Sequence, residues 1–210
     1  MEHKGYLDIV AACEADLAQY GDTFLGMGWT KRQEDADTRY RVMLEVVRAQ
    51  PGERITLLDF GCGASHLYEY MRKHGMGHID YGGLDLSEKY LAFAKRKFPT
   101  LPYYHLDVLD DDAALPTFDY VVMNGIFNYK GDQSYDEMLA YFRRLLSVMF
   151  AKSKVGLAFN VMSKQVDWER DDLFHLPFDE IASFLTKHLS RHFVIRHDYG
   201  LYEYTVYLYR

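Results

Sequence analysis

The sequence predicts an α/β protein with a doubly wound, seven-stranded sheet that is mostly parallel. After residue 51, short apolar runs alternate with stretches of helical periodicity, which is the pattern of parallel strands joined by crossover helices. The last two apolar runs flank Tyr199-Gly200, a turn signal that predicts a C-terminal antiparallel hairpin. Before residue 51 the pattern is different, and we expect only helices there.

Residues 1–50 are predicted to form an N-terminal helical annex. Weak helical periodicity covers Gly5–Gln19, and the Gly-rich segment YGDTFLGMGW follows. A second helix is expected from about Lys31 to Ala49, ended by Pro51-Gly52. We expect this annex to act as a cap over a ligand site and to belong to the same domain as residues 51–210.

The sheet and its helices are predicted from the rest of the chain. The expected strands are 55–60, 79–86, 103–106, 118–124, 155–161, 193–197 and 201–209. The expected helices are 65–74, a helix capped by Ser87, 134–151 and 178–188. In such sheets ligands bind outside the carboxyl ends of the strands, so functional residues are expected at those ends.

The bulk properties exclude several classes of function. The 210 residues carry a formal charge of −7, which disfavours a nucleic-acid partner. Two cysteines predict neither a disulfide framework nor a zinc site, and the Asp110-Asp111-Asp112 run lacks the spacing of a metal loop. The N-terminus lacks the pattern of a signal peptide, and no window resembles a membrane span. We therefore expect a cytoplasmic protein without a metal.

Two glycines lie where the first strand turns into the first helix, in Asp59-Phe60-Gly61-Cys62-Gly63. Without a Cβ, Gly61 and Gly63 let the chain turn sharply and let a ligand approach the backbone. A dinucleotide fingerprint requires a third glycine where this chain has His66, and no Gly-Lys-Ser/Thr follows for a phosphate loop. The glycines therefore predict a ligand without a pyrophosphate.

Two acids end the next two strands. Asp85 follows the second strand, where a carboxylate can accept hydrogen bonds from ribose hydroxyls. Its alternative role is to stabilise the next helix, but Ser87 already supplies a cap there. Asp107 follows the third strand, where its carboxylate can accept from an exocyclic amine while the Val108 amide meets a ring nitrogen.

Together with Phe118–Gly125 at the fourth strand, these motifs resemble the class I S-adenosylmethionine-dependent methyltransferases, which have a Rossmann-like fold. The resemblance is close over residues 55–130, although Ser65 stands where the family often has a third glycine. It implies that the glycine loop faces the methionine part of the cofactor, Asp85 the ribose, Asp107 the adenine and Asn124 the transferred methyl. The predicted cofactor-binding residues are Asp59, Gly61, Cys62, Gly63, Asp85, Leu86, Asp107, Val108, Asn124 and Gly125, with Tyr20, Trp29 and Arg39 from the annex.

Some of these residues have a second interpretation. Arg39 is expected to pair with the methionine carboxylate or, alternatively, with Glu34 or Asp35 on the surface. The catalytic candidates are His175 in the loop before the last helix, and Asn128 and Tyr129 after the fourth strand. His175 is equally well explained as a packed or exposed loop histidine.

The acceptor is expected to be a small molecule. Asn124-Gly125-Ile126-Phe127 departs from the Asn/Asp-Pro-Pro-aromatic motif of enzymes that methylate amino groups of DNA and RNA. We expect a metabolite or a sugar intermediate, methylated on oxygen or nitrogen by a monomer or homodimer. The alternatives are a catalytically silent cofactor-binding protein, an aminopropyltransferase of the same fold and a nicotinamide oxidoreductase, which would need the missing glycine.

Overall fold

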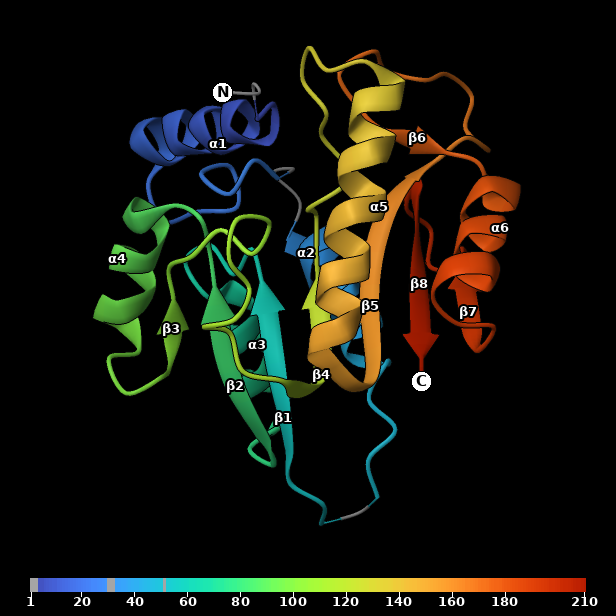
Figure 1. The fold of residues 1–210 in the computed structure, drawn as a ribbon. Helices are drawn as coiled ribbons and strands as arrows, with labels where there is room; N and C mark the ends of the chain where they lie inside the picture. The colour runs from blue at the N-terminus through green and yellow to red at the C-terminus, as the bar shows by residue number, and fades with distance from the viewer. Residues whose placement is uncertain (1–3, 30–32, 51) are drawn as a thin grey trace.

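A computed structural model of the chain describes residues 4–29, 33–50 and 52–210. Its sheet has the strand order β3-β2-β1-β4-β5-β8-β7, with β6 paired to β5 alone. The strands are β1 Ile55–Phe60, β2 Ile79–Leu84, β3 Tyr103–Tyr104, β4 Phe118–Met123, β5 Ser153–Ser163, β6 His175–Leu176, β7 Phe193–Arg196 and β8 Glu203–Tyr209. β1 to β5 are parallel, whereas β8 runs antiparallel to both β5 and β7 (Figure 1).

The predicted fold class is confirmed, with one correction to the number of strands. The sheet has eight strands instead of seven, because the two-residue strand β6 pairs with the end of β5 at Met162 and Ser163. A strand this short has no detectable alternation of apolar and polar residues. Its pairing depends on where the loop 164–174 returns to the sheet.

Helices cover both faces of the sheet. They are α1 Tyr6–Tyr20, α2 Gln33–Leu44, α3 His66–Lys73, α4 Glu88–Lys97, α5 Tyr135–Lys152 and α6 Phe178–His188. Core residues of α5 and α6 pack with one set of strand side chains, and those of α2, α3 and α4 with the alternate set. α1 lies across the carboxyl end of the parallel strands (Figure 1).

Local chemistry explains several helix boundaries. Ser87 caps α4 by accepting a hydrogen bond from the Tyr90 amide, as predicted. Ser134 and Glu137 form a reciprocal capping box at the start of α5. α6 spans the predicted residues. Asp179 and Glu180 lie in its first turn, where their negative charges interact favourably with the helix dipole.

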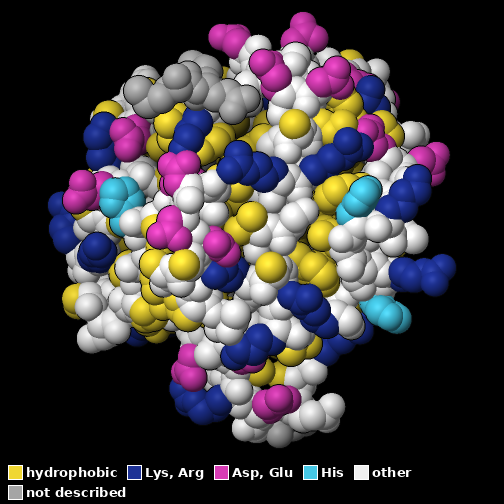
Figure 2. Space-filling view, in the orientation of Figure 1, with side chains coloured by type: hydrophobic (Ala, Val, Ile, Leu, Met, Phe, Trp, Pro, Cys, Tyr) yellow, Lys and Arg dark blue, Asp and Glu magenta, His cyan; other side chains and the backbone are white. Residues whose placement is uncertain are grey.

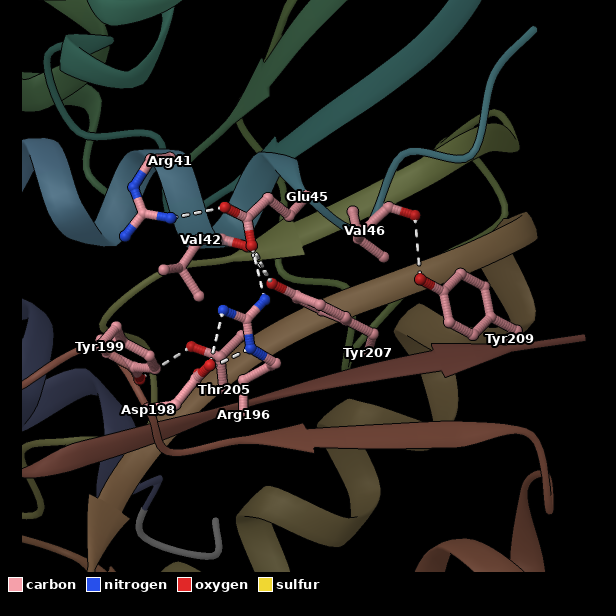
Figure 3. Close-up of polar contacts among 10 residues, drawn as sticks. All are labelled: Arg41, Val42, Glu45, Val46, Arg196, Asp198, Tyr199, Thr205, Tyr207 and Tyr209. Atoms are coloured by element: carbon pink, nitrogen blue, oxygen red, sulfur yellow. Dashed lines mark hydrogen bonds and ion pairs between the residues drawn. The ribbon is translucent and has the colours of Figure 1, made fainter.

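The second annex helix is shorter than predicted. α2 ends at Leu44 instead of Ala49, while the predicted start at Lys31 and the predicted stop at Pro51 lie outside the described residues. The hydroxyls of Tyr207 and Tyr209 on β8 donate to carbonyl oxygens at and beyond the last turn of α2, at distances of 2.5 and 3.2 Å (Figure 3).

β8 and α2 are joined along one face of the strand. Tyr207 and Tyr209 occupy alternate positions on this face, and their hydroxyls reach Val42 of α2 and Val46 just beyond its end. Arg196 on the neighbouring strand binds Glu45 at 2.6 Å (Figure 3). The annex is therefore fastened to the C-terminal hairpin, far away in the sequence.

No helix in the described part of the chain has the length and apolar character needed to cross a membrane.

Candidate functional site

A cavity lies at the carboxyl ends of β1, β2 and β4, where the strand order changes direction and ligands are expected in this class of sheet. Its floor consists of the segments 59–63, 84–87 and 124–126 that follow these strands. Its cover comes from the annex and includes Tyr6, Ile9, Val10 and Cys13 of α1 with Met27 and Trp29 of the following segment. The motifs of three separate strands thus share one cavity.

The glycine loop adopts the conformations that its sequence predicts. Gly61 and Gly63 have φ values of 72° and 52°, a region that glycine enters without strain. A Cβ on Gly63 would lie 2.9 Å from the Met27 sulfur, so this part of the cavity has no room for a side chain. Ser65 also has a positive φ, 63°, which explains why a third glycine suits this position.

Asp59 and Asp85 are carboxylates in the cavity floor. Asp85 accepts hydrogen bonds from the Gly63 and Ser87 amides, both at 2.8 Å, and so connects the glycine loop to the end of β2. Burial raises the pKa of Asp85 above its ordinary value despite these amides. Burial raises the pKa of Asp59 to about 7, although the Tyr81 hydroxyl donates to it at 2.8 Å.

Asp107 is held behind the wall of the cavity instead of lining it. One carboxylate oxygen accepts from the Tyr6 hydroxyl at 2.6 Å and from Lys4 at 3.2 Å. Burial alone would raise the pKa of Asp107, but Tyr6, the Leu109 amide and Lys4 lower it below its ordinary value. Tyr6 itself lines the cavity, so it separates Asp107 from the space, while Val108 is packed in the core.

Asn124 and Gly125 form the wall at the end of β4. Asn124 is 9% exposed, and neither its amide oxygen nor its amide nitrogen has a hydrogen-bond partner among the described residues. The Gly125 amide donates to Asn160 at 2.7 Å, and the Trp29 ring stands 3.5 Å from the place of a Cβ on Gly125. An unpaired buried amide is costly, so a ligand with complementary groups is expected at Asn124.

The predicted catalytic residues lie outside the cavity lining. His175 is buried in β6, where its Nδ1 faces the Ser163 carbonyl at 2.6 Å and its Nε2 accepts from the Arg170 amide at 3.3 Å. Because both ring nitrogens are engaged by the backbone, this placement favours the packed histidine of the two interpretations. Asn128 binds Glu203 at 3.1 Å, and Tyr129 is partly exposed and paired with Leu173.

The three annex residues predicted to bind the cofactor differ in their position relative to the cavity. Trp29 lines the cavity, whereas Tyr20 is exposed at the end of α1 and does not. Arg39 lies behind Trp29, with its guanidinium carbon 5.3 Å from the Trp29 ring centroid. Arg39 forms an ion pair with Glu203, at 2.8 Å, and the charge of Asp35 also acts on it.

His66 and Tyr6 are among the cavity residues that were not predicted from the sequence as ligand contacts. His66 lines the cavity, with Nε2 2.7 Å from Asp22 and with Nδ1 lacking a partner among the described residues. Tyr6 lines it from α1 and stacks on Tyr141 at a centroid distance of 5.0 Å. The position of His66, five residues after Gly61, could have indicated a ligand contact, because the first turn of that helix faces the same edge of the sheet as the glycine loop. Nothing in the sequence marked Tyr6.

The described residues contain no group of three or more histidine, cysteine or acidic side chains placed to hold a metal ion.

The comparisons with known proteins agree with this geometry. Residues 58–148 match the family model described as a methyltransferase domain. A candidate methyltransferase of Mycobacterium tuberculosis, Rv1506c, is 29% identical over 153 residues, covering 70% of this chain and 89% of that protein. The dTDP-3-amino-3,4,6-trideoxy-alpha-D-glucopyranose N,N-dimethyltransferase of Streptomyces venezuelae is 32% identical over 99 residues, covering 46% of this chain and 38% of that protein.

Among solved structures, the fold is similar to that of the N-methyltransferase NodS of Bradyrhizobium japonicum in complex with S-adenosyl-L-homocysteine. The TM-score is 0.64 at 15% sequence identity, and the match covers 95% of this chain and 96% of that chain.

The cavity fits S-adenosylmethionine on observations of this structure alone. Gly61 and Gly63 contribute no side chains of their own to the cavity, and Asp85 is fixed beside them by the Gly63 amide. Asn124 and His66 supply buried polar atoms that lack partners within the described residues. Motif order, cavity and family model agree on one point: residues 58–148 match a methyltransferase domain, and the residues of the cavity fit S-adenosylmethionine as the cofactor.

Proposed function

We propose that the protein transfers the methyl group of S-adenosylmethionine to an amino group of a small-molecule acceptor, such as an amino sugar. A hydroxyl acceptor is the alternative. The observation that carries the proposal is the buried Asn124 amide on the cavity wall, which has both a free donor and a free acceptor among the described residues. An amine approaching this wall would donate an N–H to the amide oxygen and keep its lone pair for the methyl carbon.

The relatives support a nitrogen acceptor through their names. The Streptomyces venezuelae relative is named as an N,N-dimethyltransferase of a nucleotide-linked amino sugar, and NodS as an N-methyltransferase. In addition, His175, the histidine predicted as a base, is held by the backbone away from the cavity. A neutral amine needs no base for its attack, whereas a hydroxyl acceptor benefits from one.

The residues of this chain would act mainly by orientation. The bound cofactor supplies an activated methyl group on a sulfonium, so the protein has to hold acceptor and cofactor in line. The glycine loop, Asp85 and His66 would hold the cofactor, and Asp59 lies beneath them. Trp29 and Gly125 would limit the space around the transferred methyl, and Asn124 would orient the amine.

The test uses cofactor labelled in the methyl group and a panel of nucleotide-linked sugars. Each amino sugar is paired with the analogue that has a hydroxyl at the same carbon. We expect label in the amino sugars and little or none in the hydroxyl analogues, with Asn124→Ala reducing transfer more than binding of S-adenosylhomocysteine.

Label in the hydroxyl analogues would show that the acceptor atom is a hydroxyl oxygen and not an amine nitrogen. Cofactor binding without transfer to any member of the panel or of a metabolite extract would indicate a binding protein. Turnover of decarboxylated cofactor would indicate an aminopropyltransferase.

A further inference from the structure

Glu203 is a buried carboxylate that the sequence analysis did not single out. It begins β8, at the same edge of the sheet as the cavity, and its side chain is only 2% exposed. By the two-residue repeat of a strand it shares the face of Tyr207 and Tyr209, whose hydroxyls bind carbonyls at and beyond the end of α2. Glu203 is therefore the member of this face nearest the ligand edge.

Three side chains from three segments donate hydrogen bonds to this carboxylate. Arg39 Nε and Asn160 Nδ2 reach Oε1, both at 2.8 Å, and Asn128 Nδ2 reaches Oε2 at 3.1 Å. Burial alone would lower the pKa of Arg39, but the charge and hydrogen bond of Glu203, together with Asp35 and Tyr199, raise it. Glu203 thus joins α2, β5 and the loop after β4 at one point.

Two of these contacts continue to the cavity wall. Through Arg39, Glu203 reaches Trp29, because the guanidinium carbon lies 5.3 Å from the Trp29 ring centroid. Through Asn160, it reaches Gly125, since the other end of the Asn160 amide accepts the Gly125 N–H at 2.7 Å. Trp29 and Gly125 face each other on the wall, so both routes end at the same place.

We propose that Glu203 is a positioning residue of the methyltransferase site, acting through Arg39 on Trp29 and through Asn160 on Gly125. Apolar side chains of similar volume would stabilise the fold equally well or better than a buried ion pair, so stability does not account for the arrangement. The arrangement is explained by orientation instead, because a carboxylate held by three fixed donors keeps those donors in one geometry. The inference rests on the wall having the role given to it in the proposed function.

The experiment measures binding of S-adenosylhomocysteine by calorimetry together with the fluorescence of Trp29. All variants carry Trp168→Phe, which removes the exposed second tryptophan and leaves Trp29 as the reporter. The variants are Glu203→Gln, Arg39→Met and the double variant, and the matched control is Tyr207→Phe. The control removes a hydrogen bond between β8 and α2 on the same strand face without touching Arg39 or Asn160.

We expect Glu203→Gln to weaken ligand binding about tenfold and to reduce the change in Trp29 emission on binding. The double variant should lose clearly less than the product of the two single losses, because both substitutions interrupt the same route. The double variant removes both charges together and leaves no unpaired buried charge, so its ligand binding can still be measured if a single variant does not fold. Tyr207→Phe should lower the unfolding temperature and leave affinity and emission unchanged.

Wild-type affinity and emission in Glu203→Gln would overturn the inference, and so would full additivity in the double variant. The outcome is separable from the proposed acceptor, because these measurements contain no acceptor. A parent protein that does not bind S-adenosylhomocysteine would overturn both the cofactor site and the inference.

Discussion

Ser65 is held in a left-handed conformation that strains any residue except glycine. Its hydroxyl compensates in part, because it lies 3.0 Å from the Tyr103 hydroxyl and 3.4 Å from that of Tyr81. We expect Ser65→Gly to be about 1–2 kcal/mol more stable than Ser65→Ala in urea unfolding, because both lose the hydroxyl and only glycine relieves the strain. Equal stability of the two variants would contradict the backbone explanation.

The Asp59 carboxyl makes stability depend on pH. Its pKa in the folded protein is raised from 3.8 to about 7, so the folded state favours the protonated form. This contribution to the free energy of unfolding is fully present below pH 3.8 and is lost as the pH rises through about 7. Asp59→Asn, which stays neutral, should therefore gain stability over wild type between pH 5 and pH 8, by at most about 4 kcal/mol.

Thermal and urea unfolding of both proteins at the two pH values check this expectation. Asp80→Asn is the control, because Asp80 is an exposed carboxylate on the neighbouring strand β2. A stability difference between Asp59→Asn and wild type that does not change with pH would contradict a raised pKa at Asp59.

Asp85 is expected to hold the ribose of the cofactor and also fixes Gly63. Asp85→Ala should weaken binding of S-adenosylhomocysteine by about 1–3 kcal/mol, the range for lost hydrogen bonds to a charged group. Calorimetry measures the loss, and the matched control is Asp80→Ala, on the strand β2 that Asp85 follows. If the affinity of Asp85→Ala equals that of wild type, Asp85 does not bind the ribose.

At the scale of elements, the annex forms the cover of the cavity, and ligand binding should stabilise it. Tyr6 and Cys13 of α1 and Met27 of the following segment line the cavity, so a bound cofactor would add contacts to residues 6–29. We expect S-adenosylhomocysteine to slow amide hydrogen exchange in 6–29 and to leave α6, which contributes no residue to the cavity lining, unchanged. Protection limited to the strand ends would show that the annex does not act as a cap.

The elements that were predicted well have local causes. Ser87 caps α4 because its hydroxyl reaches an amide three residues later, and α6 starts and ends where its periodicity does. The end of α2 could not be predicted, because hydroxyls of Tyr207 and Tyr209 bind carbonyls in its last turn and just beyond it, from more than 160 positions away. β6 and the burial of His175 also depend on how a distant loop returns to β5.

At the scale of the whole molecule, charge argues against a nucleic-acid partner. The chain carries a formal charge of −7, and on the face drawn in Figure 2 lysine and arginine side chains are mixed with acidic ones. We expect no saturable binding of labelled duplex DNA or single-stranded RNA at physiological salt, measured by fluorescence anisotropy. A DNA-binding protein of net positive charge serves as the positive control. Binding that weakens steeply as salt is added would reveal a local basic surface that the net charge hides.

The sequence by itself determined the order of strands and helices apart from β6, and the ligand edge, while the cofactor was implied by the resemblance of its motifs to a known family. These follow from local periodicity and from acids and glycines at successive strand ends, which a parallel sheet must bring to one edge. The tertiary structure decided which residues reach the cavity. Tyr6 and Trp29 line it while Tyr20 and His175 do not, and Glu203 meets Arg39 across 164 positions. Such contacts depend on how the annex packs on β8, because residues that meet there carry no shared signal in the sequence.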